Sequence, residues 1–186
     1  MQIDKNISEW MSQEWLKLSE MDNGLEREMR QQLLQNVLEQ VGIYESYAYA
    51  YERDRSMSAR GIKWNKCECS CEQLKHLWDE LFAADVNLAD KLKIHYQQYL
   101  WHLFSNRKKV ALEGQIARER FNQIQKNDVY IFYNNSEETY VVTGSEYLRD
   151  IDFDQEQDIY IMDLNNKWTY IHTHESDCGP YFYELI

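Results

Sequence analysis

The sequence predicts an α+β protein with a helical first two-thirds and a small antiparallel sheet of four or five strands, completed by the C-terminal third. Two patterns lead to this prediction. Apolar residues recur every three or four positions from about residue 7 to residue 125, as in amphipathic helices. After residue 128, short segments rich in β-branched and aromatic residues alternate with turn residues, as in hairpins. Helices followed by strands are typical of α+β folds rather than parallel sheets.

About five helices are expected. Capping boxes, in which a polar side chain bonds the start of a helix, are indicated at Asn6 with Glu9 and at Ser70 with Gln73. A turn at residues 22–24 separates the first helix from a long second one. The expected helices span about residues 7–21, 25–60, 71–82, 87–104 and 113–125.

Two hairpins and an edge strand are expected in the C-terminal third. Turn residues at 134–136 and 165–166 each lie between two segments that favour extended backbone. One helical turn is expected from Ser145 to Leu148. The expected strands span residues 129–133, 139–142, 159–162, 168–171 and 181–183.

The 186 residues are expected to form a helical N-terminal extension, residues 1–61, and an α+β domain, residues 62–186, with one continuous domain as the alternative. Fourteen tyrosines and six tryptophans argue against a disordered chain. No stretch approaches twenty apolar residues, and the first residues lack the pattern of a signal peptide. The expected location is therefore the cytoplasm, with no membrane partner.

The formal net charge is −12, which disfavours direct binding to nucleic-acid phosphates. The charge is uneven: residues 134–163 hold nine acidic residues and one basic residue, Arg149, for a net −8. Such a segment attracts basic molecules, so a basic protein is the expected partner.

A row of alternating carboxylates lies within this acidic segment. Its spacing resembles the start of a calcium loop, but the loop's glycine and its final glutamate are missing, so it fails as an EF-hand. Two interpretations remain, a solvated acidic loop and a docking surface for a basic partner. The row comprises Asp150, Asp152, Asp154, Glu156 and Asp158.

His172, His174, Glu175 and Cys178 form the sharpest candidate site. Side chains alternate along a strand, so the two histidines are expected to point to the same face. Two imidazoles with a nearby thiolate would suit zinc, and Glu175 would then be a general base. The spacing matches no standard zinc signature, which favours the other interpretation. In that interpretation the histidines bond the backbone, Cys178 packs as a small apolar residue, and no cofactor is needed.

Three of the four cysteines lie within five residues, at Cys67, Cys69 and Cys71. Structural zinc sites usually need two well-spaced pairs, and only Cys178 is left to complete a set. Cys71 lies near the start of an expected helix, where the helix dipole lowers a thiol pKa. The segment is interpreted as a connector with partly buried thiols, and a reactive or metal-binding role is the alternative.

Several short segments of the C-terminal half resemble a known family. They include residues 99–105 (YLWHLFS), 112–114 (LEG), 168–170 (WTY), 173–175 (THE) and 178–182 (CGPYF), together with Ala117, Arg118 and Phe121. On these residues the chain resembles domain of unknown function 4275, a bacterial family found chiefly in Gram-positive spore formers. The resemblance covers roughly Leu74 to Phe182 and implies no established activity.

The leading hypothesis is a non-enzymatic module whose acidic face binds a basic protein. A concrete form is an immunity-type or anti-defence inhibitor of an enzyme that acts on nucleic acid. The alternative is a small metal- or thiol-dependent enzyme built on the cluster from His172 to Cys178. A further possibility is that the first sixty residues form the seam of a homodimer.

Overall fold

The protein is described by a computed structural model covering residues 5–185. The chain divides into two compact units, unit 1 (Met1–Ser56) and unit 2 (Met57–Ile186). The fold is mixed α+β, with six α-helices and one seven-stranded antiparallel sheet in the described part of the chain.

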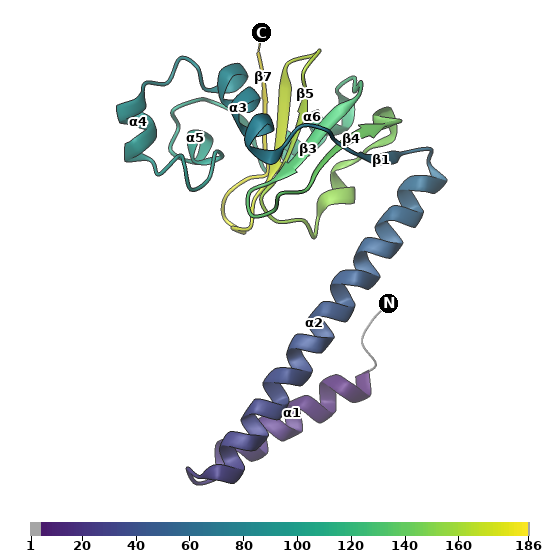
Figure 1. Cartoon of the computed structure of the whole chain (residues 1–186), viewed down its shortest axis with the longest axis vertical. Coiled ribbons are helices and arrows are strands. Elements are labelled where there is room, and N and C mark those ends of the chain that lie inside the picture. Colours follow the sequence, from purple (N-terminus) through teal and green to yellow (C-terminus); the bar gives the residue numbers. More distant parts are fainter. Residues whose placement is uncertain (1–4, 186) are drawn as a thin grey trace. The chain divides into compact units, whose positions relative to one another are not determined.

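Unit 1 is a helical hairpin formed by α1 (Lys5–Glu20) and most of α2 (Leu25–Ala59), whose last residues belong to unit 2 (Figure 1). Its two fully buried side chains among the described residues are Leu18 and Leu34, one from each helix. The expected long second helix is confirmed, and Gly42 does not interrupt it. The expected cap at Asn6 concerns a side chain outside the described part.

The sheet of unit 2 has the strand order β1-β4-β3-β5-β6-β7-β2. The two expected hairpins and the C-terminal strand are confirmed, but that strand is not an edge, because β2 and β6 pair with its two sides. The expected total of four or five strands is also wrong. The two additional strands are short and largely exposed, so they lack the apolar alternation that predicts a strand. The strands are β1 (Lys63–Lys66), β2 (Leu112–Glu113), β3 (Val129–Tyr133), β4 (Thr139–Thr143), β5 (Ile159–Asp163), β6 (Trp168–His172) and β7 (Tyr181–Glu184).

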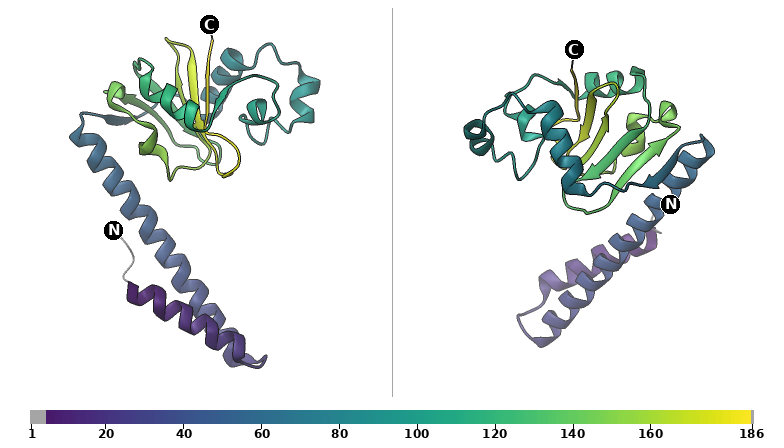
Figure 2. Two further views of the ribbon diagram at one scale, coloured as in Figure 1. Left: turned by 180° about the vertical axis from the view of Figure 1, so that it is seen from behind. Right: turned by 45° about the horizontal axis from the view of Figure 1, so that its top comes forward.

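Helices cover both faces of this sheet (Figure 2). On one face, α3 (Cys71–Phe82) and the segment that holds α4 (Leu88–Lys93) and α5 (His102–Ser105) bury an aromatic cluster. On the other face, α6 (Gln115–Gln123) packs against the opposite side chains of the same strands. Each central strand therefore sends alternate side chains into two cores, as its period of two requires.

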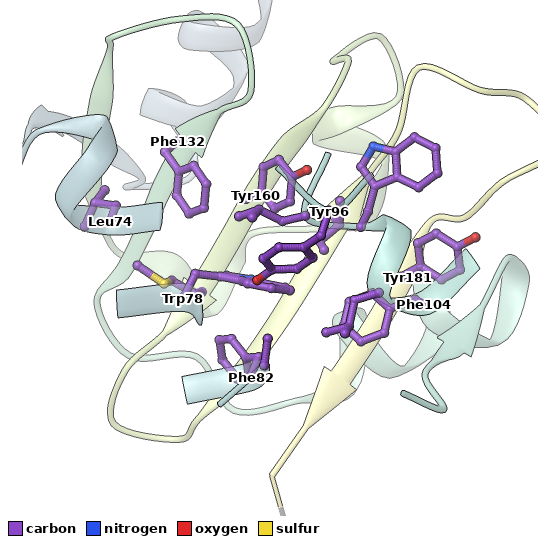
Figure 3. Close-up of a cluster of buried hydrophobic side chains, with 14 of the residues drawn as sticks. Leu74, Trp78, Phe82, Tyr96, Phe104, Phe132, Tyr160 and Tyr181 are labelled. Carbon is purple, nitrogen blue, oxygen red and sulfur yellow. The ribbon is translucent and has the colours of Figure 1, made fainter. Parts of the chain in front are cut away.

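The aromatic cluster under α3 is the larger of the two cores (Figure 3). Trp78 is fully buried, and its indole N–H donates to Thr169 Oγ1 at 2.9 Å. Tyr160 stacks on Phe132 with ring centres 4.8 Å apart. The capping box that begins α3 is confirmed, because Ser70 and Gln73 bond each other's backbone N–H.

The expected helix over residues 87–104 is wrong. α4 ends at Lys93, and His95 adopts a left-handed backbone with φ of 52°. The chain then continues irregularly to α5, which has four residues. Between α4 and α5, Tyr96, Leu100 and Trp101 are buried in the aromatic core although no helix runs through them. The pattern therefore reflected burial of the segment rather than helical period.

Candidate functional site

A pocket of unit 2 lies beside His174 and has a volume of about 430 Å³. Three segments meet there: the start of α6, the loop before β5, and the loop between β6 and β7. We call it the His174 pocket. It is lined by Gly114, Gln115, Arg118, Asp154, Gln155, Glu156, Gln157, His172, Thr173, His174, Glu175, Ser176, Cys178, Gly179 and Pro180.

His174 is held by a buried carboxylate. Its Nδ1 lies 2.8 and 2.9 Å from the two carboxylate oxygens of Asp158, whose side chain is 5% exposed. Because a carboxylate accepts hydrogen bonds, Nδ1 carries the proton that is donated to Asp158. The indole N–H of Trp101 donates to the same carboxylate at 3.0 Å. The Nε2 of His174 lies 3.9 Å from Glu175 Oε1.

His172 lines the same pocket but is engaged differently. Its Nδ1 lies 2.8 Å from the carbonyl oxygen of Glu156, which can only accept, so Nδ1 is the donor. Its Nε2 lies 3.4 Å from a guanidinium nitrogen of Arg118, which can only donate. Burial lowers the pKa of His172, and the neighbouring guanidinium acts in the same direction. His172 is thus a neutral ring with both nitrogens bonded, as the backbone-bonding interpretation expects.

The predicted zinc ligands do not converge. Within residues 5–185, no group of three His, Cys, Asp or Glu side chains is arranged to hold a metal ion. Cys178 is half-buried, and burial together with a hydrogen bond to Glu175 raises the pKa of its thiol. A raised pKa keeps the thiol protonated, which is the opposite of what a nucleophile needs.

The five carboxylates of the acidic row differ in exposure and in partners: Asp150 and Asp158 are buried, whereas Asp154 is exposed. Asp150 and Asp154 both accept from Arg118, at 3.1 and 2.5 Å. Asp152 accepts from Arg60 at 2.5 and 3.1 Å, and Asp158 accepts from His174. The reason is local, because Asp150–Phe153 forms a 3-10 helix, in which alternate side chains do not share a face. Its carboxylates therefore point to different partners, and Asp154 and Glu156 line the His174 pocket.

The cysteine-rich connector holds two half-buried thiols, those of Cys67 and Cys69, and the buried thiol of Cys71. The backbone N–H of Cys69 donates to Cys67 Sγ at 3.3 Å, and contact with that thiol raises the pKa of Cys69. Cys71 is the first residue of α3 and is 3% exposed. The expectation that its thiol pKa is lowered is wrong, because burial outweighs the helix N-terminus and raises it.

Sequence reasoning missed two residues that shape the pocket. Trp101 and Arg118 belong to the segments that resemble a family, but neither was nominated as a site residue. Arg118 lies 32 residues from Asp150 and Trp101 lies 57 residues from Asp158, so no local spacing reveals either bond. A usable signal was that Trp101 and His174 both belong to the aromatic segments that resemble one family.

The comparisons with known proteins give a family and nothing more specific. No curated protein and no solved structure matches the chain. No described helix combines the length and the apolar character needed to cross a membrane. A family described as a domain of unknown function (DUF4275) matches residues 51–182, and thus begins earlier than the expected start near Leu74. Because the match spans more than half of the 186 residues, the chain belongs to the DUF4275 family.

Proposed function

We propose that unit 2 is a non-enzymatic protein-binding module and that its His174 pocket receives a basic side chain of the partner. The observation that carries this proposal is the charge of the lining. Asp154, Glu156 and Glu175 contribute carboxylates, and Arg118 is the opposing cation. Carboxylates therefore outnumber cations in this lining by three to one, and Arg118 bonds two carboxylates, those of Asp150 and Asp154.

The pocket offers a basic side chain more than charge. Glu175 has a side chain that is 49% exposed, so it can reorient toward a lysine or arginine. Pairing a guanidinium with a carboxylate in a partly enclosed pocket is stronger than pairing on an open surface, because less water screens it. The net charge of −12 adds long-range attraction for a basic molecule.

A concrete form of this proposal is an inhibitor of the immunity or anti-defence type. Such a protein would cover the positively charged cleft of an enzyme that acts on nucleic acid. Complementary charge would speed the encounter, while the pocket would fix the register of the two surfaces.

A pull-down with the full chain from lysate of the source cells tests the proposal. The beads are washed at low and at high salt, and the retained proteins are identified by mass spectrometry. We expect a basic protein that is retained in about the same molar amount as the bait at low salt and is released at high salt. If no such protein is retained under either wash, the proposal fails.

A second candidate function is acid–base catalysis, and the Asp158–His174 pair favours it. A buried carboxylate that fixes Nδ1 leaves Nε2 available for proton transfer to a bound molecule. This version of the enzyme hypothesis needs neither zinc nor the Cys178 thiol. A panel of chromogenic ester and phosphodiester substrates tests it: turnover that is lost in His174→Gln supports it, and absence of turnover in the wild type rejects it.

A further inference from the structure

An apolar stripe runs along α2 on a side of the helix that α1 does not cover. Its members follow a spacing of three or four residues, so they share one helical face. Their side chains are between 44% and 74% exposed. The stripe, which we call the α2 seam, consists of Leu25, Met29, Leu33, Ile43, Tyr47 and Tyr51, and it continues through the polar residues Asn36 and Gln40.

The α2 seam is distinct from the contact between the two helices of the hairpin. Leu34 is 2% exposed and marks the side of α2 that meets α1. At 100° per residue, the seam is centred about 140° from that side. A third side, centred about 80° from Leu34 in the other direction, carries polar residues such as Gln31 and Gln35, which are exposed. Thus α2 has one covered apolar side, one uncovered apolar side and one polar side.

The size and pattern of the seam identify what covers it. Each apolar member exposes roughly half of about 150–200 Å², so the six expose on the order of 500–700 Å², near the roughly 800 Å² per partner of a standard interface. From Met29 to Tyr47 the spacing is 4-3-4-3-4, which is the heptad repeat of a coiled coil. Polar residues within such a seam, here Asn36 and Gln40, set the register of two helices at some cost in stability.

We propose that unit 1 joins two copies of this chain through their α2 seams. An identical copy presents the same apolar stripe and the same polar positions, so the two surfaces are complementary by symmetry. Asn36 and Gln40 of one copy then meet polar groups of the other instead of leaving unpaired amides against an apolar surface. The proposal is independent of the His174 pocket, which lies in unit 2.

The test is the mass of the full chain in solution, measured by sedimentation velocity over a range of concentrations. The wild type is expected to be a dimer. The double variant Met29→Glu with Leu33→Glu puts carboxylates into the seam, so its dimer dissociation constant is expected to rise at least about 100-fold. The matched control is Gln31→Glu with Gln35→Glu, which adds the same charge on the polar side and is expected to stay dimeric.

Two results would overturn the proposal. One is a wild type that remains monomeric at every concentration, which would mean that the seam is covered by unit 2 or by another protein. The other is a seam variant that dimerises as well as its control. Far-UV circular dichroism confirms that all variants keep their helices, which is expected because every substituted position is exposed.

Discussion

The two units of the chain place their apolar and charged side chains in opposite ways. Unit 2 buries three tryptophans to below 2% exposure and bonds most of its acidic loop internally. Unit 1 buries Leu18 and Leu34, while twelve of the chain's twenty exposed large apolar residues in the described part lie on its two helices. The difference indicates that unit 2 is stabilised by its own core, whereas unit 1 leaves most of its large apolar side chains uncovered.

The comparison also separates two roles of charge. In unit 2, Arg60 and Arg118 reach carboxylates that are distant in sequence, so these ion pairs connect elements of the fold. In unit 1, the ion pairs include neighbours on one helix, such as Arg30 with Glu26, whose side chains are both exposed. Exposed pairs of this kind contribute little to stability.

The largest expected effect is on the free energy of unfolding of unit 2, when its core is disrupted. Trp78→Ala removes a fully buried indole and leaves Thr169 without its donor, which should lower the free energy of unfolding by about 3–5 kcal/mol. Trp78→Phe is the control that keeps the aromatic packing and should cost clearly less. Thermal unfolding followed by near-UV circular dichroism measures both, and an unchanged melting temperature for Trp78→Ala would contradict a core-stabilised unit 2.

A smaller effect is expected from the matching change in unit 1. Leu34→Ala removes one of the two buried contacts of the hairpin and should destabilise unit 1 by about 2 kcal/mol. The unfolding of unit 2 should be unaffected if each unit has its own core. Hydrogen exchange resolved by residue separates the two units, and equal acceleration of exchange in both would show that they unfold together.

A still smaller effect concerns pH. Burial lowers the pKa of His172 below its usual value of 6.5 in the folded protein. Below pH 6.5 the unfolded chain therefore binds a proton that the folded chain does not, and stability falls as the pH drops toward the folded pKa. Because the ring is partly exposed, solvent screening limits the loss to less than about 1 kcal/mol.

His172→Asn tests this pH dependence. The variant lacks the titrating group, so its melting temperature should fall less than that of the wild type between pH 7 and pH 5. Parallel curves for the two proteins would show that the acid sensitivity arises elsewhere.

Local pattern predicted the hairpins of the sheet and the first three helices, because in these segments one period dominates. It failed between residues 94 and 101, where Tyr96 and Leu100 have helical spacing but are buried in an irregular segment. It also failed for β1 and β2, which are exposed edges held by pairing rather than by apolar residues. Spacing along the chain carries no information about such tertiary contacts.

The candidate site shows the same limit. The sequence nominated His174 and Glu175, and the structure places both in one pocket. The sequence did not indicate that Asp158 lies buried against His174, because it does not show which carboxylate of an acidic segment bonds which partner. The charge of a segment was therefore predictable, whereas the direction of each carboxylate was not.

The central functional claim is that the His174 pocket, rather than general acidity, selects the partner. The direct measurement is capture of the basic protein by three full-length baits under one low-salt wash: the wild type, Glu156→Gln with Glu175→Gln, and Glu137→Gln with Glu146→Gln. Both double variants lose two negative charges, but only Glu156→Gln with Glu175→Gln alters the lining of the His174 pocket. We expect the wild type and the Glu137→Gln with Glu146→Gln variant to capture the basic protein equally. The amount captured by the Glu156→Gln with Glu175→Gln variant should be at least tenfold lower. Equal capture by both variants would contradict the claim.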